Sequence, residues 1–166
     1  MNIDIKISSL VTSDLDEITS LARAVSELHI IPLMKNHEKK VMREARDRDL
    51  LLLVGSEKFT TLKAVYNGNI VGFITWKNSN FISMLYVHFT WQRKGIGTKL
   101  LNEAVKNIRC SSVELVSSRN AIEFYKKYGF EFTVINQQSI DVIPMKYECG
   151  CDGLFKYEKQ GLSYEK

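Results

Sequence analysis

Two glycines and two cations stand where a helix begins in this chain. Residues 92–98 read QRKGIGT, and the apolar residues that follow recur at helical spacing: Leu100, Leu101, Ala104, Val105 and Ile108. The first turn of a helix leaves backbone N–H groups unpaired at the positive end of its dipole. Glycine lets a ligand approach them closely, while Arg93 and Lys94 add positive charge. The stretch predicts a phosphate or diphosphate site, with the Thr98 hydroxyl as one more donor.

Two common phosphate-binding motifs do not fit this stretch. The nucleotide P-loop needs the string G-x-x-x-x-G-K-[ST], which the sequence lacks. The dinucleotide fingerprint needs a third small residue, and Leu100 stands at that position. An alternative is that the glycines only relieve packing against the preceding strand, but it does not explain the neighbouring cations.

The remaining sequence predicts an α/β fold, a mixed sheet with helices on both faces. Alternating or β-rich runs predict strands at 2–8, 60–66, 70–77, 81–87, 113–117, 130–136 and 139–147. Helical spacing predicts four helices. The first has about fifteen residues from Asp14, and the others span residues 36–47, the stretch from the glycines to residue 109, and residues 120–128. Residues 50–54 could extend the second helix or form a strand. Asn67-Gly68 predicts a hairpin turn.

Composition narrows the class of protein. The 166 residues predict one domain over 1–147 and a polar tail over 148–166. The net charge is +4 and the basic clusters are short and lack interleaved aromatic residues, so nucleic-acid binding is not favoured. No apolar run is long enough for a membrane span. Three cysteines, an odd number, favour a reducing cytoplasm, and Cys149-Gly150-Cys151 does not predict a metal site.

Two motifs carry a resemblance to a known family. Gln92-x-x-Gly95-x-Gly97, after a strand and at the start of a helix, resembles the acyl-CoA pyrophosphate loop of the GNAT superfamily of N-acetyltransferases. Residues 120–130, NAIEFYKKYGF, resemble the last helix of that family, in which an aromatic pair precedes Gly-Phe. Ile143-Pro144-Met145 also fits many members, although Phe89 stands where proline is common. The likeness covers residues 3–147 and implies about seven mostly antiparallel strands that splay in the middle.

The resemblance implies that acetyl-CoA lies between the two diverging strands. Backbone groups of Leu85, Tyr86 and Val87 would pair with the pantetheine arm. Asn120 and Phe124 would contact the arm from the far side, although the family often has its asparagine at the position of Ser118. The pyrophosphate would be held by the N–H groups of Gln92, Arg93, Lys94, Gly95, Ile96, Gly97 and Thr98.

The resemblance also implies direct attack of an amine on the thioester. The Leu85 N–H would stabilise the oxyanion, and Tyr125 would protonate the leaving thiolate. The alternative for Tyr125 is a half-buried structural aromatic. Some relatives carry a glutamate early in the strand before the loop, but residues 81–83 have no carboxylate. His88 is the predicted base, or else it caps the strand, and Glu131 is a weaker candidate.

The acceptor is predicted less sharply than the cofactor. A small-molecule amine is favoured over a protein, and the apolar residues within 26–40 form a candidate wall for it, near His29 and His37. A possible homodimer follows from the family alone. The competing function is a non-catalytic acyl-CoA-binding or sensor module. For the loop, the sequence predicts that Gly97→Asp abolishes cofactor binding and changes thermal stability little.

Overall fold

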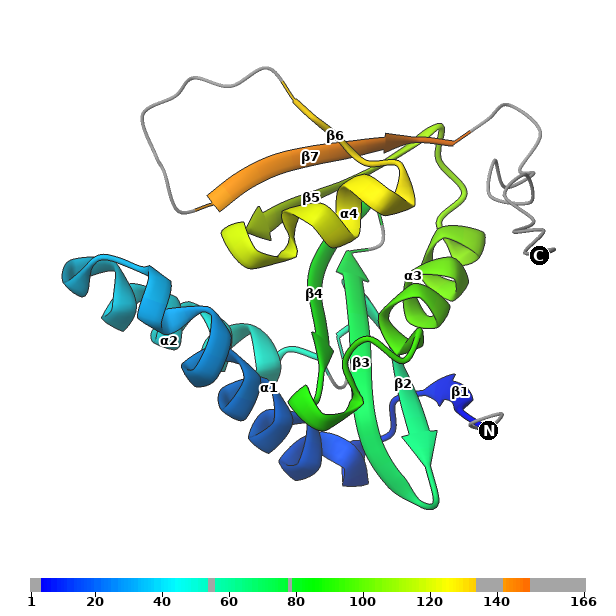
Figure 1. Cartoon of the computed structure of the whole chain (residues 1–166). Helices are drawn as coiled ribbons and strands as arrows, with labels where there is room; N and C mark the ends of the chain where they lie inside the picture. Colours follow the sequence, from blue (N-terminus) through cyan, green and yellow to red (C-terminus); the bar gives the residue numbers. More distant parts are fainter. Residues whose placement is uncertain (1–3, 54–55, 78, 134–141, 150–166) are drawn as a thin grey trace, which may run out of the picture.

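The computed structural model describes residues 4–53, 56–77, 79–133 and 142–149. Within this part, seven strands form one sheet in the order β1-β2-β3-β4-β5-β7-β6 (Figure 1). The strands are β1 (Lys6–Ser9), β2 (Phe59–Tyr66), β3 (Asn69–Lys77), β4 (Phe81–Val87), β5 (Ser112–Ser118), β6 (Glu131–Phe132) and β7 (Val142–Glu148). The helices are α1 (Leu15–His29), α2 (Asn36–Leu51), α3 (Ile96–Asn107) and α4 (Ile122–Tyr128). The predicted fold class and sheet are confirmed.

The hairpin between β2 and β3 forms where the sequence places it. Asn67 and Gly68 both have positive φ angles, 48° and 84°, as a tight turn between twisted antiparallel strands requires. Further along β3, Gly72 allows a close approach of β4, because a Cβ there would lie 2.9 Å from the Tyr86 carbonyl oxygen.

The sheet splits between its fourth and fifth strands. Pairing of β4 with β5 is parallel and joins only Phe81 with Glu114 and Ile82 with Leu115. By contrast, β5 pairs with β7 along its whole length. The rest of β4, from Ser83 to Val87, therefore does not pair with β5. The gap between the two strands opens toward the start of α3.

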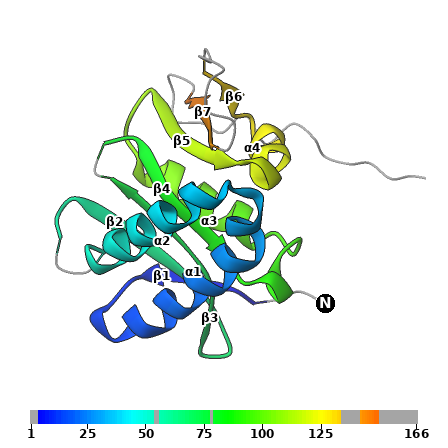
Figure 2. The ribbon, with the colours of Figure 1, turned by 90° about the vertical axis from the view of Figure 1, so that its left-hand side faces the viewer.

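The helices cover two faces of the sheet. In Figure 1, α1 and α2 lie on one side of the β2–β4 strands and α3 lies on the other, and Figure 2 shows α1 and α2 in front of the sheet. Buried residues of α1 form one core with Phe73 and Met84. Buried residues of α3 and α4 form the larger core with Ile74, Leu115 and other sheet residues. Leu28, although apolar and at helical spacing from the buried Leu21 and Val25, is 54% exposed.

The second helix buries a charged residue. Residues 50 and 51 extend α2, which settles the alternative between helix and strand for the start of that run. Val41, although apolar, is 65% exposed. The residues of α2 that are buried are Arg46 and Leu50. Arg46 donates to Glu27 on α1 and to Asp47, so its charge is paired where it is removed from water.

The last predicted strands and the predicted tail lie partly outside the described residues. Of the predicted 130–136 strand, the structure shows β6, while residues 134–141 lie outside the described residues, as does most of the predicted tail. The Cys149 N–H donates to the Ser111 carbonyl at 2.8 Å, so the described fold reaches residue 149. Among the described helices, none has the length and apolar character needed to cross a membrane.

Candidate functional site

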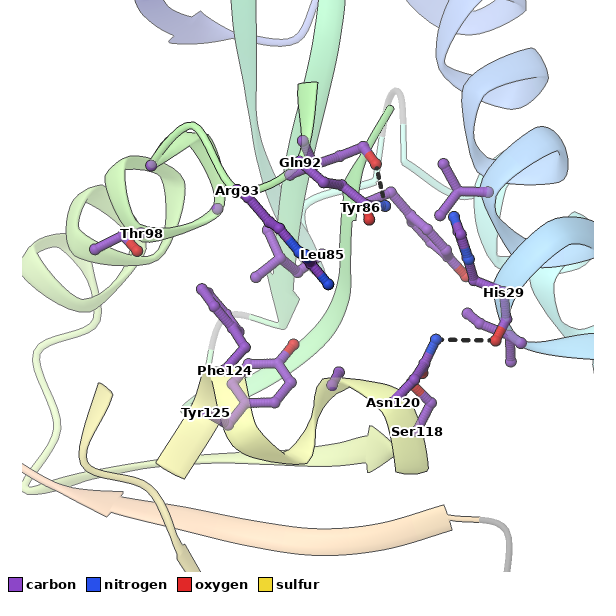
Figure 3. Close-up of a pocket in the computed structure, with 16 residues that line it drawn as sticks. His29, Leu85, Tyr86, Gln92, Arg93, Thr98, Ser118, Asn120, Phe124 and Tyr125 are labelled. Atoms are coloured by element: carbon purple, nitrogen blue, oxygen red, sulfur yellow. Dashed lines mark hydrogen bonds between the residues drawn. The ribbon is translucent and has the colours of Figure 1, made fainter. Parts of the chain in front are cut away.

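A cleft of about 390 Å³ opens where β4 and β5 diverge. Its walls come from the end of α1, the second half of β4, the loop before α3, and the segment from the end of β5 into α4 (Figure 3). The cleft therefore lies at the gap in the sheet, where backbone groups of β4 have no strand partner. The lining residues are Val25, His29, Ile30, Leu85, Tyr86, Val87, Gln92, Arg93, Gly95, Gly97, Thr98, Ser118, Asn120, Ala121, Phe124 and Tyr125.

A second cleft of about 240 Å³ adjoins the first. It extends to Ile82 and Leu115, where β4 and β5 still pair, and is bounded by residues of α2 and of the segment that joins α1 to α2. Six residues line both clefts and so mark their junction: Ile30, Leu85, Tyr86, Ser118, Ala121 and Tyr125. A reaction between two ligands, one in each cleft, would take place at this junction.

The start of α3 presents unpaired backbone donors to the first cleft. At the start of α3, the first backbone N–H that donates to a backbone carbonyl is that of Lys99, which bonds the Gly95 carbonyl at 3.0 Å. In the hydrogen bonds described outside the helices and strands, none uses an N–H of residues 93–98 as donor. Arg93 and Gly95 have positive φ angles of 58° and 78°, which turn successive amides to one side. The backbone geometry of the segment therefore suits an anion, as its sequence predicts.

Side chains around this loop divide between the cleft and the protein interior. Arg93 extends into the cleft from the start of α3, on the side opposite Tyr125 (Figure 3). Lys94 lies over the Trp91 ring, 4.6 Å from its centroid, and is not among the lining residues. Ile96 is buried in the larger core, so only its backbone could serve a ligand.

The backbone of β4 alternates between β3 and the cleft. The His88 N–H donates to the Val71 carbonyl at 2.9 Å. Because antiparallel residues face their partner alternately, the backbone of Tyr86 faces β3, whereas those of Leu85 and Val87 face the gap. The Gln92 amide donates to the Val87 carbonyl at 3.0 Å. The geometry thus leaves the Leu85 N–H open and disfavours a backbone contact from Tyr86.

Tyr125 stands at the junction with its hydroxyl toward β4 (Figure 3). Only 8% of the residue is exposed, and its ring meets those of Phe124 and Phe130 edge to face at 5.0 and 5.5 Å. Burial raises the pKa of the Tyr125 phenol above its ordinary value, with Tyr86 adding to the shift. The hydroxyl is therefore protonated throughout the neutral range and is available as a donor.

The end of α1 closes the cleft opposite β5. The Asn120 side chain donates to the His29 carbonyl at 3.0 Å and accepts from the Ser118 hydroxyl at 2.7 Å. The His29 imidazole forms part of the wall, and its Nε2 is buried with no hydrogen-bond partner in the described part of the chain. Asn120 thus joins the two halves of the molecule at the site.

The other predicted titratable candidates lie elsewhere. His88 caps the turn that follows β4, with its Nδ1 2.9 Å from the Thr90 hydroxyl, and it lines neither cleft. His37 is exposed on α2, with its Nε2 3.8 Å from a Glu38 carboxylate oxygen, and Glu131 is exposed on β6. Several lining residues of the second cleft belong to no sequence motif, among them Ser83, Met42 and Met84. Only the divergence of β4 from β5 brings them together.

Comparisons with known proteins agree with this geometry. Residues 29–149 match the Acetyltransferase (GNAT) domain family. Over 85 residues the chain is 32% identical to the uncharacterized protein YdhI of Bacillus subtilis (strain 168). The match covers 45% of this chain and 51% of YdhI, so the chain spans about half the length of that relative.

Solved structures show the same fold at low sequence identity. The PaiA N-acetyltransferase of Thermoplasma acidophilum, crystallised with coenzyme A, has 23% identity and a TM-score of 0.73 over 87% of this chain and 99% of its own. A GCN5-related N-acetyltransferase of Rhodopseudomonas palustris has 21% identity and a TM-score of 0.75 over 89% and 98%. With the family match spanning most of the described residues, the chain belongs to the GNAT acetyltransferase family.

Proposed function

We propose that this protein transfers the acetyl group of acetyl-CoA to the primary amine of a small molecule. The observation that carries the proposal is the junction at Tyr125, where a cleft with unpaired amides at one end meets a second cleft of small-molecule size. Family membership supports the reaction class, and the coenzyme A bound to the Thermoplasma protein supports the donor.

The residues of the first cleft fit coenzyme A. A diphosphate needs several donors at once, and the N–H groups of residues 93–98 have no partner in the described structure. Gly97 leaves the approach free of a side chain, and Arg93 adds a cation at the cleft wall. The Leu85 N–H and the Val87 backbone would pair with an extended arm along β4, and Phe124 would bound it from α4.

The chain then supplies donors to the reacting atoms. Bound acetyl-CoA contributes the thioester from which the acetyl group leaves. The Leu85 N–H, directed into the gap, stabilises the negative charge that develops on the carbonyl oxygen as the amine adds. As the tetrahedral adduct collapses and its C–S bond breaks, the Tyr125 hydroxyl would donate its proton to the departing sulfur, so that a neutral thiol leaves. The phenolate would then regain a proton from solvent.

The amine must lose a proton before or as it attacks. Two histidines are candidates, and the geometry favours His29 over the predicted His88, because His29 lines the cleft and His88 is engaged in a cap. An imidazole accepts protons at neutral pH. His29 would take the proton directly or through water that fills the cleft.

A panel of primary amines tests the proposal, with thiol release from acetyl-CoA as the readout. Tyr125→Phe keeps the ring contacts and removes the donor, so we expect kcat to fall by about 100-fold while the dissociation constant of coenzyme A changes little. His29→Asn is expected to lower kcat/KM by about 10-fold or more, and His88→Asn to lower it less. Unchanged kcat in Tyr125→Phe would remove the phenol from the mechanism.

A non-catalytic acyl-CoA-binding module is the second candidate. The observation that favours it is the lining of both clefts, which contains no carboxylate among the described residues. Coenzyme A binding without thiol release for any amine of the panel would favour this module over the transferase.

A further inference from the structure

We infer that the acceptor is a singly charged amine on an apolar body, and that the second cleft excludes acceptors with another ionic group. The inference rests on the proposed function, since it names the substrate class of that site. It follows from the composition of the cleft wall and from the charges behind it.

The second cleft is walled mainly by flexible and branched apolar side chains. From α2 and the segment before it come Ile30, Met34 and Met42, and from the two strands come Ile82, Met84, Leu115 and Val116. Unbranched methionines adapt to ligands of varied shape. The volume of 240 Å³ equals about eight water-sized groups at roughly 30 Å³ each, which suits a short alkyl or aryl amine.

None of the lining residues of the second cleft, all within the described part of the chain, carries an ionised side chain. A second ammonium on the acceptor would lose its water without gaining a carboxylate, and a carboxylate would lose its water without gaining a cation. The reacting amine escapes this cost because it must become neutral to attack.

The charges behind the wall supply no counter-ion to it. On α1 and α2, the guanidinium groups of Arg23, Arg43 and Arg46 are paired with the carboxylates of Glu27 and Asp47. At the Tyr86 phenol, which lines the wall, the charges of Arg46 and Asp49 act in opposite directions. Neither a second ammonium nor a carboxylate on the acceptor therefore gains a partner from behind the wall.

One buried hydroxyl in the wall can serve a neutral polar group. The Ser83 Oγ is buried without a hydrogen-bond partner among the described residues. The Ser117 hydroxyl, by contrast, already donates to the Ser118 carbonyl at 2.8 Å. Ser83 is therefore free to hydrogen-bond the amine nitrogen or a neutral oxygen of the acceptor.

Three acceptors of matched length test the inference: hexylamine, 1,6-diaminohexane and 6-aminohexanoate. With acetyl-CoA and a thiol-detecting dye, we expect kcat/KM for hexylamine to exceed the other two by about 100-fold, because each of these buries an unpaired charge. Equal or better turnover of the diamine or the amino acid would overturn the inference and leave the acetyltransferase proposal standing. Thiol release with none of a broad amine panel, with coenzyme A still bound, would overturn both.

Variants of the wall give a second readout. Met42→Glu adds a carboxylate to the second cleft, and we expect it to raise the ratio of diamine to hexylamine turnover by about 10-fold or more. Val41→Glu is the matched control, because Val41 is the neighbouring residue on α2, is mostly exposed and lines neither cleft. Met34→Glu repeats the test at a lining residue of the segment before α2. Equal ratios in Met42→Glu, Met34→Glu and Val41→Glu would contradict the assignment of this wall to the acceptor.

Discussion

Gly97 illustrates how a single residue serves packing and binding together. A Cβ at this position would lie 3.3 Å from the Phe124 ring, which reaches across from α4, and 3.8 Å from Val87. The structural alternative for the glycines is therefore correct in part, although the partner is mainly α4 rather than the preceding strand. The same missing side chain leaves the first turn of α3 open to a ligand.

Two variants separate these roles of Gly97. Gly97→Ala adds only the Cβ, which Phe124 can accommodate by turning within the cleft, and the better helix propensity of alanine offsets the contact. We expect a modest loss of coenzyme A affinity. Gly97→Asp adds a charge that repels the diphosphate but suits the helix N-terminus, so we expect at least about 100-fold weaker binding with little change in melting temperature. Calorimetry measures both, and retained affinity in Gly97→Asp would refute the loop as the pyrophosphate site.

At the scale of elements, what could be predicted depended on whether the signal was local. Hydrophobic periodicity and turn-forming residues predicted the order of strands and helices. Each of these signals, such as the Asn67-Gly68 turn or the apolar face of α3, depends on residues close together in the sequence. The inward face of α2 could not be predicted in this way. Arg46 can be buried because Glu27, nineteen residues earlier on α1, pairs with its charge, whereas the apolar Val41 is exposed.

The same limit applies to the candidate site. The loop at 92–98 was predictable because its function depends on backbone amides in one stretch of sequence. The second cleft was not, since Ser83, Met42 and Leu115 meet only through the loss of pairing between β4 and β5 after Ile82. His88 was predicted as the base from its position near the strand end, but its cap with Thr90 depends on the turn that only the structure defines.

The contact between α1 and α2 makes stability depend on pH. Hydrogen bonds from Arg43 first, and then from Arg46, lower the pKa of Glu27 from its ordinary 4.5 to about 2. A carboxyl with a lowered pKa stabilises the folded state above its ordinary pKa, and that stabilisation disappears as the pH falls from about 4.5 to about 2. The side chain is 41% exposed, so solvent screening reduces the effect.

Glu27→Gln tests this linkage. We expect the variant to unfold at lower denaturant concentration than the wild type at pH 7, and the difference to shrink steadily as the pH is lowered through the interval between 4.5 and 2. Glu44→Gln, on the exposed side of α2, is the control and should give a smaller difference. A gap between wild type and Glu27→Gln that stays constant across this interval would show that the ion pairs do not carry the pH dependence.

At the scale of the molecule, the site is the place where two halves of one sheet part. Strands β1–β4 form one half and β5, β7 and β6 form the other, and two residue pairs join them. Asn120 adds a link from the β5 side to the end of α1. A ligand that lies along β4 and meets α4 would replace the missing pairing, so binding should stabilise the region of the gap more than the hairpin of β2 and β3.

Hydrogen exchange with and without coenzyme A tests this coupling. A saturating ligand at 100 times its dissociation constant stabilises the folded state by about 2.7 kcal/mol, and we expect added protection at residues 93–98, where the amides gain a partner, and at Leu85. S-acetylpantetheine, which lacks the diphosphate, is the matched ligand, and it should protect Leu85 while leaving residues 93–98 nearly unchanged. Protection by coenzyme A that is confined to the β2–β3 hairpin would place the ligand outside the gap, because no described residue of those two strands lines either cleft.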